Sequence, residues 1–215
     1  MRHSIADATA AGDAVADAIR QLMARHNRPI LIAIDGASGS GKSTFALRLV
    51  AEFKAALVQS DDFFAAGISN AEWDARTPEE RATDAIDWQR VRVEALEPLL
   101  AGKSAKWHPF DFAGGVCPDG TYAMRSDFVE REPALVIVLE GVYSTGGALA
   151  DLIDLTVLVD APREVRHERV QAREEQEFLA AWHTRWDAAE EVYFTKIRPR
   201  SSFDLVVTSK ATPSS

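Results

Sequence analysis

Short hydrophobic runs alternate with amphipathic segments along most of the chain. Apolar positions recur at helical spacing in residues 4–26, 42–53 and 87–102, and a charge-rich helical pattern covers 162–194. Apolar runs typical of buried strands lie between and after them, at 29–35, 55–60, 134–141, 155–160 and 203–209. This alternation predicts an α/β fold of three layers, in which helices cover both faces of a mostly parallel sheet of about five strands.

Two regions interrupt this alternation. Residues 65–87 are polar and irregular, so we expect a loop there. Residues 103–133 contain several glycines and prolines, which indicates a loop-rich insertion that can hold a hairpin. The first helical segment precedes the first strand. We therefore expect residues 1–29 to form an N-terminal helix packed on a core domain that spans 30–210.

Composition narrows the possible classes of protein. The chain has 215 residues, 47% of them hydrophobic, which suits one globular domain. No apolar run is long enough to span a membrane, and the N-terminus lacks the apolar segment of a secretory signal. Cys117 is the single cysteine, which rules out an intramolecular disulfide and favours the cytoplasm. The net charge of −9 argues against nucleic-acid or membrane partners and leaves a small molecule as the expected one.

The stretch "IDGASGSGKST" joins the first predicted strand to the helix that follows it. It fits the phosphate-loop pattern G-x-x-x-x-G-K-[ST], in which backbone N–H groups and a helix N-terminus surround phosphate groups. Lys42 would reach the β- and γ-phosphates, and the Ser43 hydroxyl would ligate Mg²⁺. We therefore expect ATP and Mg²⁺ to bind at Gly36, Ala37, Ser38, Gly39, Ser40, Gly41, Lys42, Ser43 and Thr44.

Several classes of protein use such a loop. The guanine-reading motif Asn-Lys-x-Asp of GTPases is absent, and large motor or transporter ATPases are longer. A small kinase fits best. A nucleoside monophosphate kinase and a nucleotide-sensing module without enzymatic activity remain as alternatives.

Acidic residues follow two of the predicted strands. Asp61 and Asp62 come directly after the strand at 55–60, and Glu140 ends the strand at 134–141. Ligands of open α/β sheets bind beyond the carboxyl ends of the strands. One of the two aspartates could take a proton from an acceptor hydroxyl, while the other caps a turn. Glu140 could hold Mg²⁺ or its water shell.

The late helical segment carries arginines on one face. Arg163, Arg166, Arg169 and Arg173 are spaced by three, three and four residues. We interpret residues 162–190 as a lid region whose arginines approach the triphosphate, because an anion would relieve their mutual repulsion. Neighbouring glutamates could instead offset the charge.

Taken together, "DGASGSGKST", "SDDFF", "FDF" at 110–112, "VLEGVY" and the late arginines resemble the uridine kinase and phosphoribulokinase group of P-loop kinases. The resemblance runs from about residue 30 to 208. It implies a P-loop NTPase-type fold with a lid and ATP-dependent phosphorylation of a hydroxyl on a nucleoside-like or sugar-like acceptor. By this resemblance Asp61 is the catalytic base, with Asp62 as the second candidate. Lys42 and Arg169 assist catalysis, and Arg166 and Arg173 bind ATP. The acceptor would contact Asp62, Phe64, Arg81, Phe110, Phe112 and Tyr143, and Mg²⁺ would bind Ser43 and Glu140.

The chain also departs from true uridine kinases. No histidine follows the aromatic pair Phe110 and Phe112, although uridine kinases use one to read the pyrimidine. Arg81 stands near the place of their ribose-binding aspartate, although Asp84 or Asp87 could substitute for it, and Phe64 replaces a usual tyrosine. The acceptor therefore stays open among nucleosides, sugars and pantothenate-like or fructose-type alcohols. A homodimer contact through the N-terminal helix also stays open.

Overall fold

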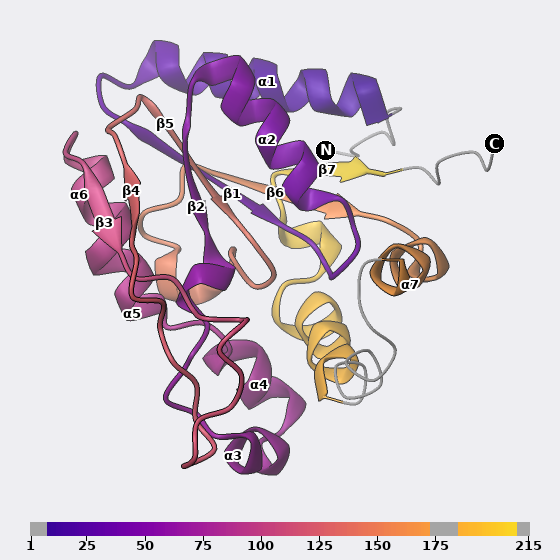
Figure 1. Ribbon diagram of the computed structural model, residues 1–215. Coiled ribbons are helices and arrows are strands. Elements are labelled where there is room, and N and C mark those ends of the chain that lie inside the picture. Colours follow the sequence, from indigo (N-terminus) through magenta and orange to yellow (C-terminus); the bar gives the residue numbers. More distant parts are fainter. Residues whose placement is uncertain (1–7, 173–184, 210–215) are drawn as a thin grey trace.

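A five-stranded parallel sheet forms the centre of the protein (Figure 1). The computed structural model describes residues 8–172 and 185–209. Its strands are β1 (Ile30–Asp35), β2 (Ala56–Gln59), β5 (Val136–Glu140), β6 (Leu155–Asp160) and β7 (Leu205–Thr208), in the spatial order β2-β5-β1-β6-β7. The predicted fold class is confirmed, because every neighbouring pair in this sheet is parallel.

The central strands bring polar residues to one edge of the sheet. β1 and β5 are buried along their whole length, as their unbroken apolar runs predict. In the pairing register Ile34 lies beside Glu140, and Gln59 lies on the other side of Glu140. The carboxyl ends of β1, β2 and β5 therefore meet at one edge, where the segments that follow them can share a site.

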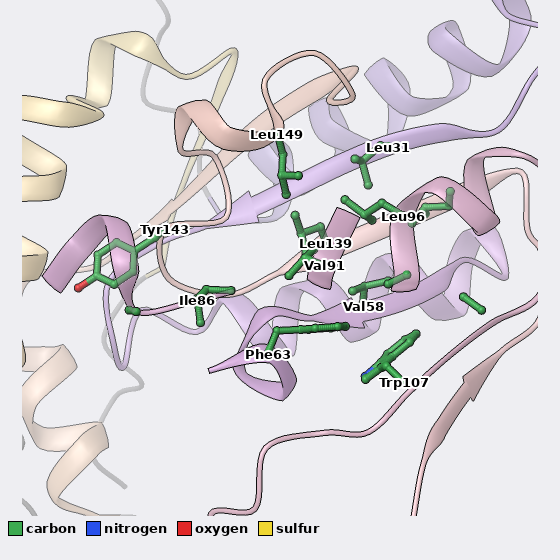
Figure 2. Packing of buried hydrophobic residues seen from close by; sticks show 14 of the residues in the cluster. Leu31, Val58, Phe63, Ile86, Val91, Leu96, Trp107, Leu139, Tyr143 and Leu149 are labelled. Carbon is green, nitrogen blue, oxygen red and sulfur yellow. The ribbon is translucent and has the colours of Figure 1, made fainter. Parts of the chain in front are cut away.

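Helices cover both faces of the sheet. On one face, α1 (Ala8–Arg25) and α2 (Lys42–Phe53) pack through buried residues such as Val15, Ile19 and Leu49 (Figure 1). The other face carries a second cluster, in which Leu31 and Leu139 of the strands meet Leu96 (Figure 2). Alternate residues of β1, β2 and β5 serve the two clusters, as strands buried on both faces require.

The predicted helix at 87–102 spans α5 (Trp88–Arg90), a π turn (Val91–Leu96) and α6 (Glu97–Leu100). In the π turn, the backbone N–H of Glu97 bonds to the carbonyl of Arg92, five residues earlier. Pro98 lacks an N–H, so the chain cannot make the normal helical bond at that position. We attribute the π turn to this proline.

Residues 65–87 contain helices where the sequence predicts a loop. They form α3 (Asn70–Ala75) and α4 (Pro78–Asp84), and each begins with a capping box. Ser69 pairs with Glu72 in the first box, and Thr77 pairs with Glu80 in the second. The prediction was wrong because both helices are too short to show hydrophobic periodicity, whereas their caps were visible in the sequence.

The insertion at 103–133 contains a hairpin. Strands β3 (Ala105–Trp107) and β4 (Val129–Arg131) pair in antiparallel fashion. Isolated bridges extend the pairing, from Phe110 to Met124 and from Val116 to Tyr122. The hairpin projects from the main sheet beside α3 and α4 (Figure 1).

Two described segments represent the late helical region. Helix α7 (Arg163–Gln171) precedes the gap in the described residues, and a helix at 185–192 follows it. The latter continues into a π turn (Tyr193–Ile197) and then leads through a 3₁₀ turn (Arg200–Ser202) to β7. Arg173 and the middle of the predicted lid lie outside the described residues. Within the described part of the chain, no helix is both long and apolar enough to cross a membrane.

Candidate active site

The loop between β1 and α2 has the conformation that its glycines allow. Gly39 and Gly41 adopt left-handed φ angles of 77° and 94°, and Gly41 caps the helix that begins at Lys42. A Cβ atom at Gly39 would lie 2.4 Å from the backbone oxygen of Arg166. Glycine is therefore required at position 39 for α7 to approach the loop so closely. The N-terminus of α2 points N–H groups into the loop, which suits an anion such as a phosphate.

A buried carboxylate anchors the start of this loop. Asp35, the last residue of β1, is fully buried and accepts five hydrogen bonds from four residues. The donors are the backbone N–H groups of Gly36, Tyr143 and Thr145, the Thr145 hydroxyl and the Tyr193 hydroxyl. Burial raises the pKa of Asp35, while the bonds from Thr145, Tyr193 and Gly36 oppose the rise. Asp35 thus ties the loop to the segments after β5 and after helix 185–192.

Ser43 and Glu140 face one another at the first turn of α2. The Ser43 hydroxyl donates a 3.0 Å hydrogen bond to Glu140, which is 4% exposed. Burial raises the pKa of Glu140, the positive charge of Lys42 lowers it, and the negative charge of Asp61 raises it further. A hydroxyl beside a carboxylate is a donor set that Mg²⁺ accepts when phosphates and waters supply its remaining ligands. These residues therefore fit the expected metal site.

Asp61 and Asp62 interact with different sides of the site. Both lie on the 3₁₀ turn Ser60–Phe63 that follows β2. Asp61 is exposed, and its charge acts on Glu140 beside the loop. Asp62 accepts a 2.8 Å hydrogen bond from the indole N–H of Trp107. Burial raises the pKa of Asp62, and the Trp107 bond and the charge of Arg131 oppose this rise. Asp61 is therefore the aspartate whose charge acts on Glu140, the hydrogen-bond partner of Ser43.

Aromatic side chains gather next to this turn. The ring centroid of Phe64 lies 5.1 Å from that of Phe110 and 5.6 Å from that of Trp186. Phe110 is buried, whereas Phe112, whose ring centroid lies 4.6 Å from that of Phe110, is 63% exposed. The sequence named Phe64, Phe110 and Phe112 as acceptor residues, and the structure brings all three together. Their contact with an acceptor stays a prediction.

Two other predicted acceptor residues have structural partners. The Arg81 guanidinium donates hydrogen bonds to the backbone oxygens of Trp73, Asp74 and Arg185. Tyr143 is buried, has a left-handed φ of 70° and packs its ring on Tyr193. Burial raises the pKa of Tyr143 well above its usual value. Arg81 therefore joins α3 and α4 to helix 185–192, and Tyr143 packs on Tyr193 and bonds to Asp35 through its backbone N–H. The contact of each with an acceptor stays a prediction.

Two arginines of α7 contact the phosphate loop itself. Arg169 donates hydrogen bonds to the backbone oxygens of Gly39 and Ser40, at 3.1 and 3.2 Å. Arg166 lies 3.5 Å from the backbone oxygen of Ser38 and 3.5 Å from the Glu190 carboxylate. The predicted row of arginines thus reaches the loop through these two members. Their contact with ATP stays a prediction.

Sequence reasoning missed two carboxylates that shape this site. Asp35 lies in the stretch "IDGASGSGKST", immediately before Gly36. A single acidic residue at the end of an apolar strand could have marked it as a residue of the site. Glu190 comes from a region rich in glutamate, where no local pattern distinguishes it. Glu190 is 7% exposed and accepts hydrogen bonds from both the backbone N–H and the hydroxyl of Ser38.

Comparison with known proteins is consistent with this geometry. Residues 32–181 match the AAA domain family. The chain is 30% identical over 155 residues to a uridine kinase of Lactobacillus johnsonii, a match that covers 70% of each chain. Matches to the uridine kinases of Streptococcus gordonii and Ligilactobacillus salivarius, at 27% and 30% identity, span 65% of those proteins' lengths.

Solved structures share the fold. A putative fructose transport system kinase from a Silicibacter species superposes with a TM-score of 0.64 at 20% identity, covering 91% of this chain and 98% of that one. A D-glycerate 3-kinase from Cryptococcus neoformans gives 0.59 at 14% identity, covering 94% and 96%. These structures show the shared fold, and the AAA domain match with the 30% identical uridine kinase shows that the chain belongs to the uridine kinase and phosphoribulokinase-like family of P-loop kinases.

Proposed function

We propose that the protein is an ATP-dependent kinase that transfers the γ-phosphate to a hydroxyl of a small nucleoside-like or sugar-like acceptor. One observation carries the proposal: the exposed Asp61 lies on the turn directly after β2, whose last residue Gln59 pairs with Glu140, and Glu140 accepts the hydrogen bond from Ser43. A carboxylate there can orient an incoming hydroxyl toward a phosphate held by the loop.

Each residue then has a role that its position supports. Lys42 and the loop N–H groups hold the phosphates, and Asp61 accepts the proton of the acceptor hydroxyl. Ser43 and Glu140 would hold Mg²⁺, which neutralises phosphate charge when bound. The second aspartate, Asp62, is held by Trp107 and so supports the wall of the site.

The aromatic cluster around Phe64 supports an acceptor with an apolar face. Phe64 and Phe112 offer ring surface next to the turn that carries Asp61. Rings of this kind stack on bases or cover the apolar face of a sugar, so the cluster does not distinguish the two. The identity of the acceptor is therefore a question for an activity screen. The family also leaves a pantothenate-like alcohol and a nucleoside monophosphate as alternatives.

The experiment is an ADP-release assay with Mg²⁺ and ATP over nucleosides, nucleoside monophosphates, sugars, glycerate and pantothenate. We expect one hydroxylated acceptor without a phosphate to stimulate ADP release. Stimulation by monophosphates alone would favour the monophosphate kinase alternative. ATP binding without stimulation by any acceptor would favour a nucleotide-sensing module.

The two aspartates are compared with the acceptor so identified. Asp61→Asn should retain ATP binding and lose roughly 10²–10⁴-fold in kcat, as expected for the loss of a general base. Asp62→Asn makes the same change at the second candidate base, and a larger loss of kcat there than in Asp61→Asn would assign the role to Asp62. A fully active Asp61→Asn enzyme would refute the assignment of Asp61 as the base.

A further inference from the structure

Glu190 is a buried carboxylate bonded to the phosphate loop. Its two oxygens lie 3.1 and 3.2 Å from the backbone nitrogen of Ser38, and the Ser38 hydroxyl donates a 2.5 Å hydrogen bond to it. Arg166 approaches the same carboxylate at 3.5 Å. Burial raises the pKa of Glu190, and the bonds from Ser38 and the charges of Lys42 and Arg166 oppose the rise. Glu190 therefore contacts both the third residue of the loop and Arg166 of α7.

The helix that carries Glu190 also contacts the aromatic cluster. Trp186 lies four residues before Glu190 and Tyr193 three residues after it, so all three share one face of the helical segment. Trp186 packs edge-on against Phe64, at a centroid distance of 5.6 Å. Tyr193 donates a 2.8 Å hydrogen bond to Asp35 at the start of the loop. One continuous helical segment thus contacts both the aromatic cluster and the phosphate loop.

A glycine-rich loop gains from such an anchor. Glycine loses more conformational entropy on ordering than any other residue, and "GASGSG" contains three of them. If the loop is ordered before nucleotide arrives, binding does not have to supply that entropy. Hydrogen bonds to a charged group are stronger than those between neutral groups, so the bonds from Ser38 to Glu190 favour one conformation of this short loop.

We propose that Glu190 is a positioning residue, which sets the conformation of the phosphate loop through Ser38 and keeps the loop in register with the aromatic cluster around Phe64. The effect on nucleotide binding follows from the contacts alone. The further step, that this placement of the loop relative to the aromatic cluster aligns ATP with an acceptor, rests on the proposed function. Glu190 itself need not touch substrate.

The test uses calorimetric titration of the full chain with Mg²⁺ and a non-hydrolysable ATP analogue. Glu190→Gln should weaken binding by roughly tenfold, since an amide cannot accept both Ser38 hydrogen bonds with the strength of a carboxylate. Glu191→Gln is the matched control, because Glu191 is exposed on the same helix and carries the same charge. Unchanged binding in Glu190→Gln, or an equal loss in Glu191→Gln, would overturn the proposal.

A double-mutant cycle separates positioning from general destabilisation. Ser38→Ala should weaken analogue binding severalfold. Glu190→Gln should then reduce the affinity for the analogue by a smaller factor in the Ser38→Ala chain than in the wild-type chain. Fully additive losses would refute action through Ser38. Tighter binding in Glu190→Gln would also refute it, because the carboxylate would then be competing with phosphate. If Glu190→Gln does not fold, Ser38→Ala decides alone: weaker binding supports the proposal and unchanged binding overturns it.

The same titration distinguishes this inference from the proposed function. Failure of the wild-type chain to bind the analogue would argue against the kinase itself. If the wild-type chain binds the analogue and Glu190→Gln binds it with the same affinity, the result would argue against the positioning role alone. With an acceptor in hand, Glu190→Gln should raise the KM for ATP more than it lowers kcat, whereas a partly unfolded enzyme would lose kcat at constant KM.

Discussion

The hydroxyl of Ser43 donates a 3.0 Å hydrogen bond to the carboxylate of Glu140, joining the first turn of α2 to the end of β5. The two residues are 97 positions apart in the chain, and the parallel pairing of β1 with β5 brings them together. The pair offers a hydroxyl and a carboxylate at the place where the loop would hold phosphates.

Removing the charge of Glu140 should weaken the response to Mg²⁺. We expect Glu140→Gln to raise the Mg²⁺ concentration for half-maximal ADP release by roughly 10–100-fold, as loss of a metal-supporting carboxylate usually does. The measurement is a Mg²⁺ titration at saturating ATP. Glu130→Gln, an exposed change in the hairpin, is the control. An unaltered Mg²⁺ requirement would remove Glu140 from the metal site.

Glu140 should also make stability depend on pH. Burial raises its pKa in the folded state, so the folded protein holds this proton more tightly than the unfolded chain does. The stability that protonated Glu140 provides is complete below its unfolded pKa and is lost as pH rises through the folded pKa. Without Mg²⁺, the wild-type melting temperature should therefore fall relative to that of Glu140→Gln between pH 4 and pH 8. A constant difference between the two would contradict this.

Gly39 should not tolerate a side chain. Gly39→Ala would place a Cβ atom 2.4 Å from the Arg166 backbone oxygen at a left-handed φ of 77°. Strain of this kind costs about 1–3 kcal/mol, and relief would move α7 away from the loop. We expect a lower melting temperature and weaker ATP binding. Gly67→Ala is the control, because its Cβ would meet nothing within 4 Å. Equal effects of the two changes would show that the contact with α7 is unimportant.

Asp35 should matter most for stability. Asp35→Asn keeps the size of the side chain but replaces one carboxylate oxygen with an NH₂ group, which cannot accept a hydrogen bond. In one orientation this group faces the donors of Thr145 and Tyr193, and in the other it faces the N–H groups of Gly36 and Tyr143. Leaving buried donors unpaired costs about 1–3 kcal/mol each. Chemical denaturation should show a loss of at least about 2 kcal/mol, whereas Asp13→Asn on the exposed surface of α1 should show almost none. An unchanged free energy of unfolding in Asp35→Asn would exclude Asp35 as an anchor of the loop.

Predictions that depended on local patterns succeeded. The apolar runs of β1 and β5 gave buried parallel strands, because alternating helices and strands can bury both faces of a sheet in few ways. The phosphate loop was also recognisable, since its glycines and lysine lie within eight consecutive residues. The helices α3 and α4 were missed because they are held by caps and by contacts such as that of Arg81, not by an apolar stripe.

The sequence by itself determined the five strands of the main sheet in chain order, the phosphate loop and the acids that follow the strands, because each is written in neighbouring residues. Only the tertiary structure decided which distant residues join that loop. Asp35 collects donors from three segments, Glu190 reaches Ser38 across 152 positions, and Asp61 and Asp62 interact with different partners. Such contacts follow from how whole elements pack, and packing is a property of the complete chain that no local spacing encodes.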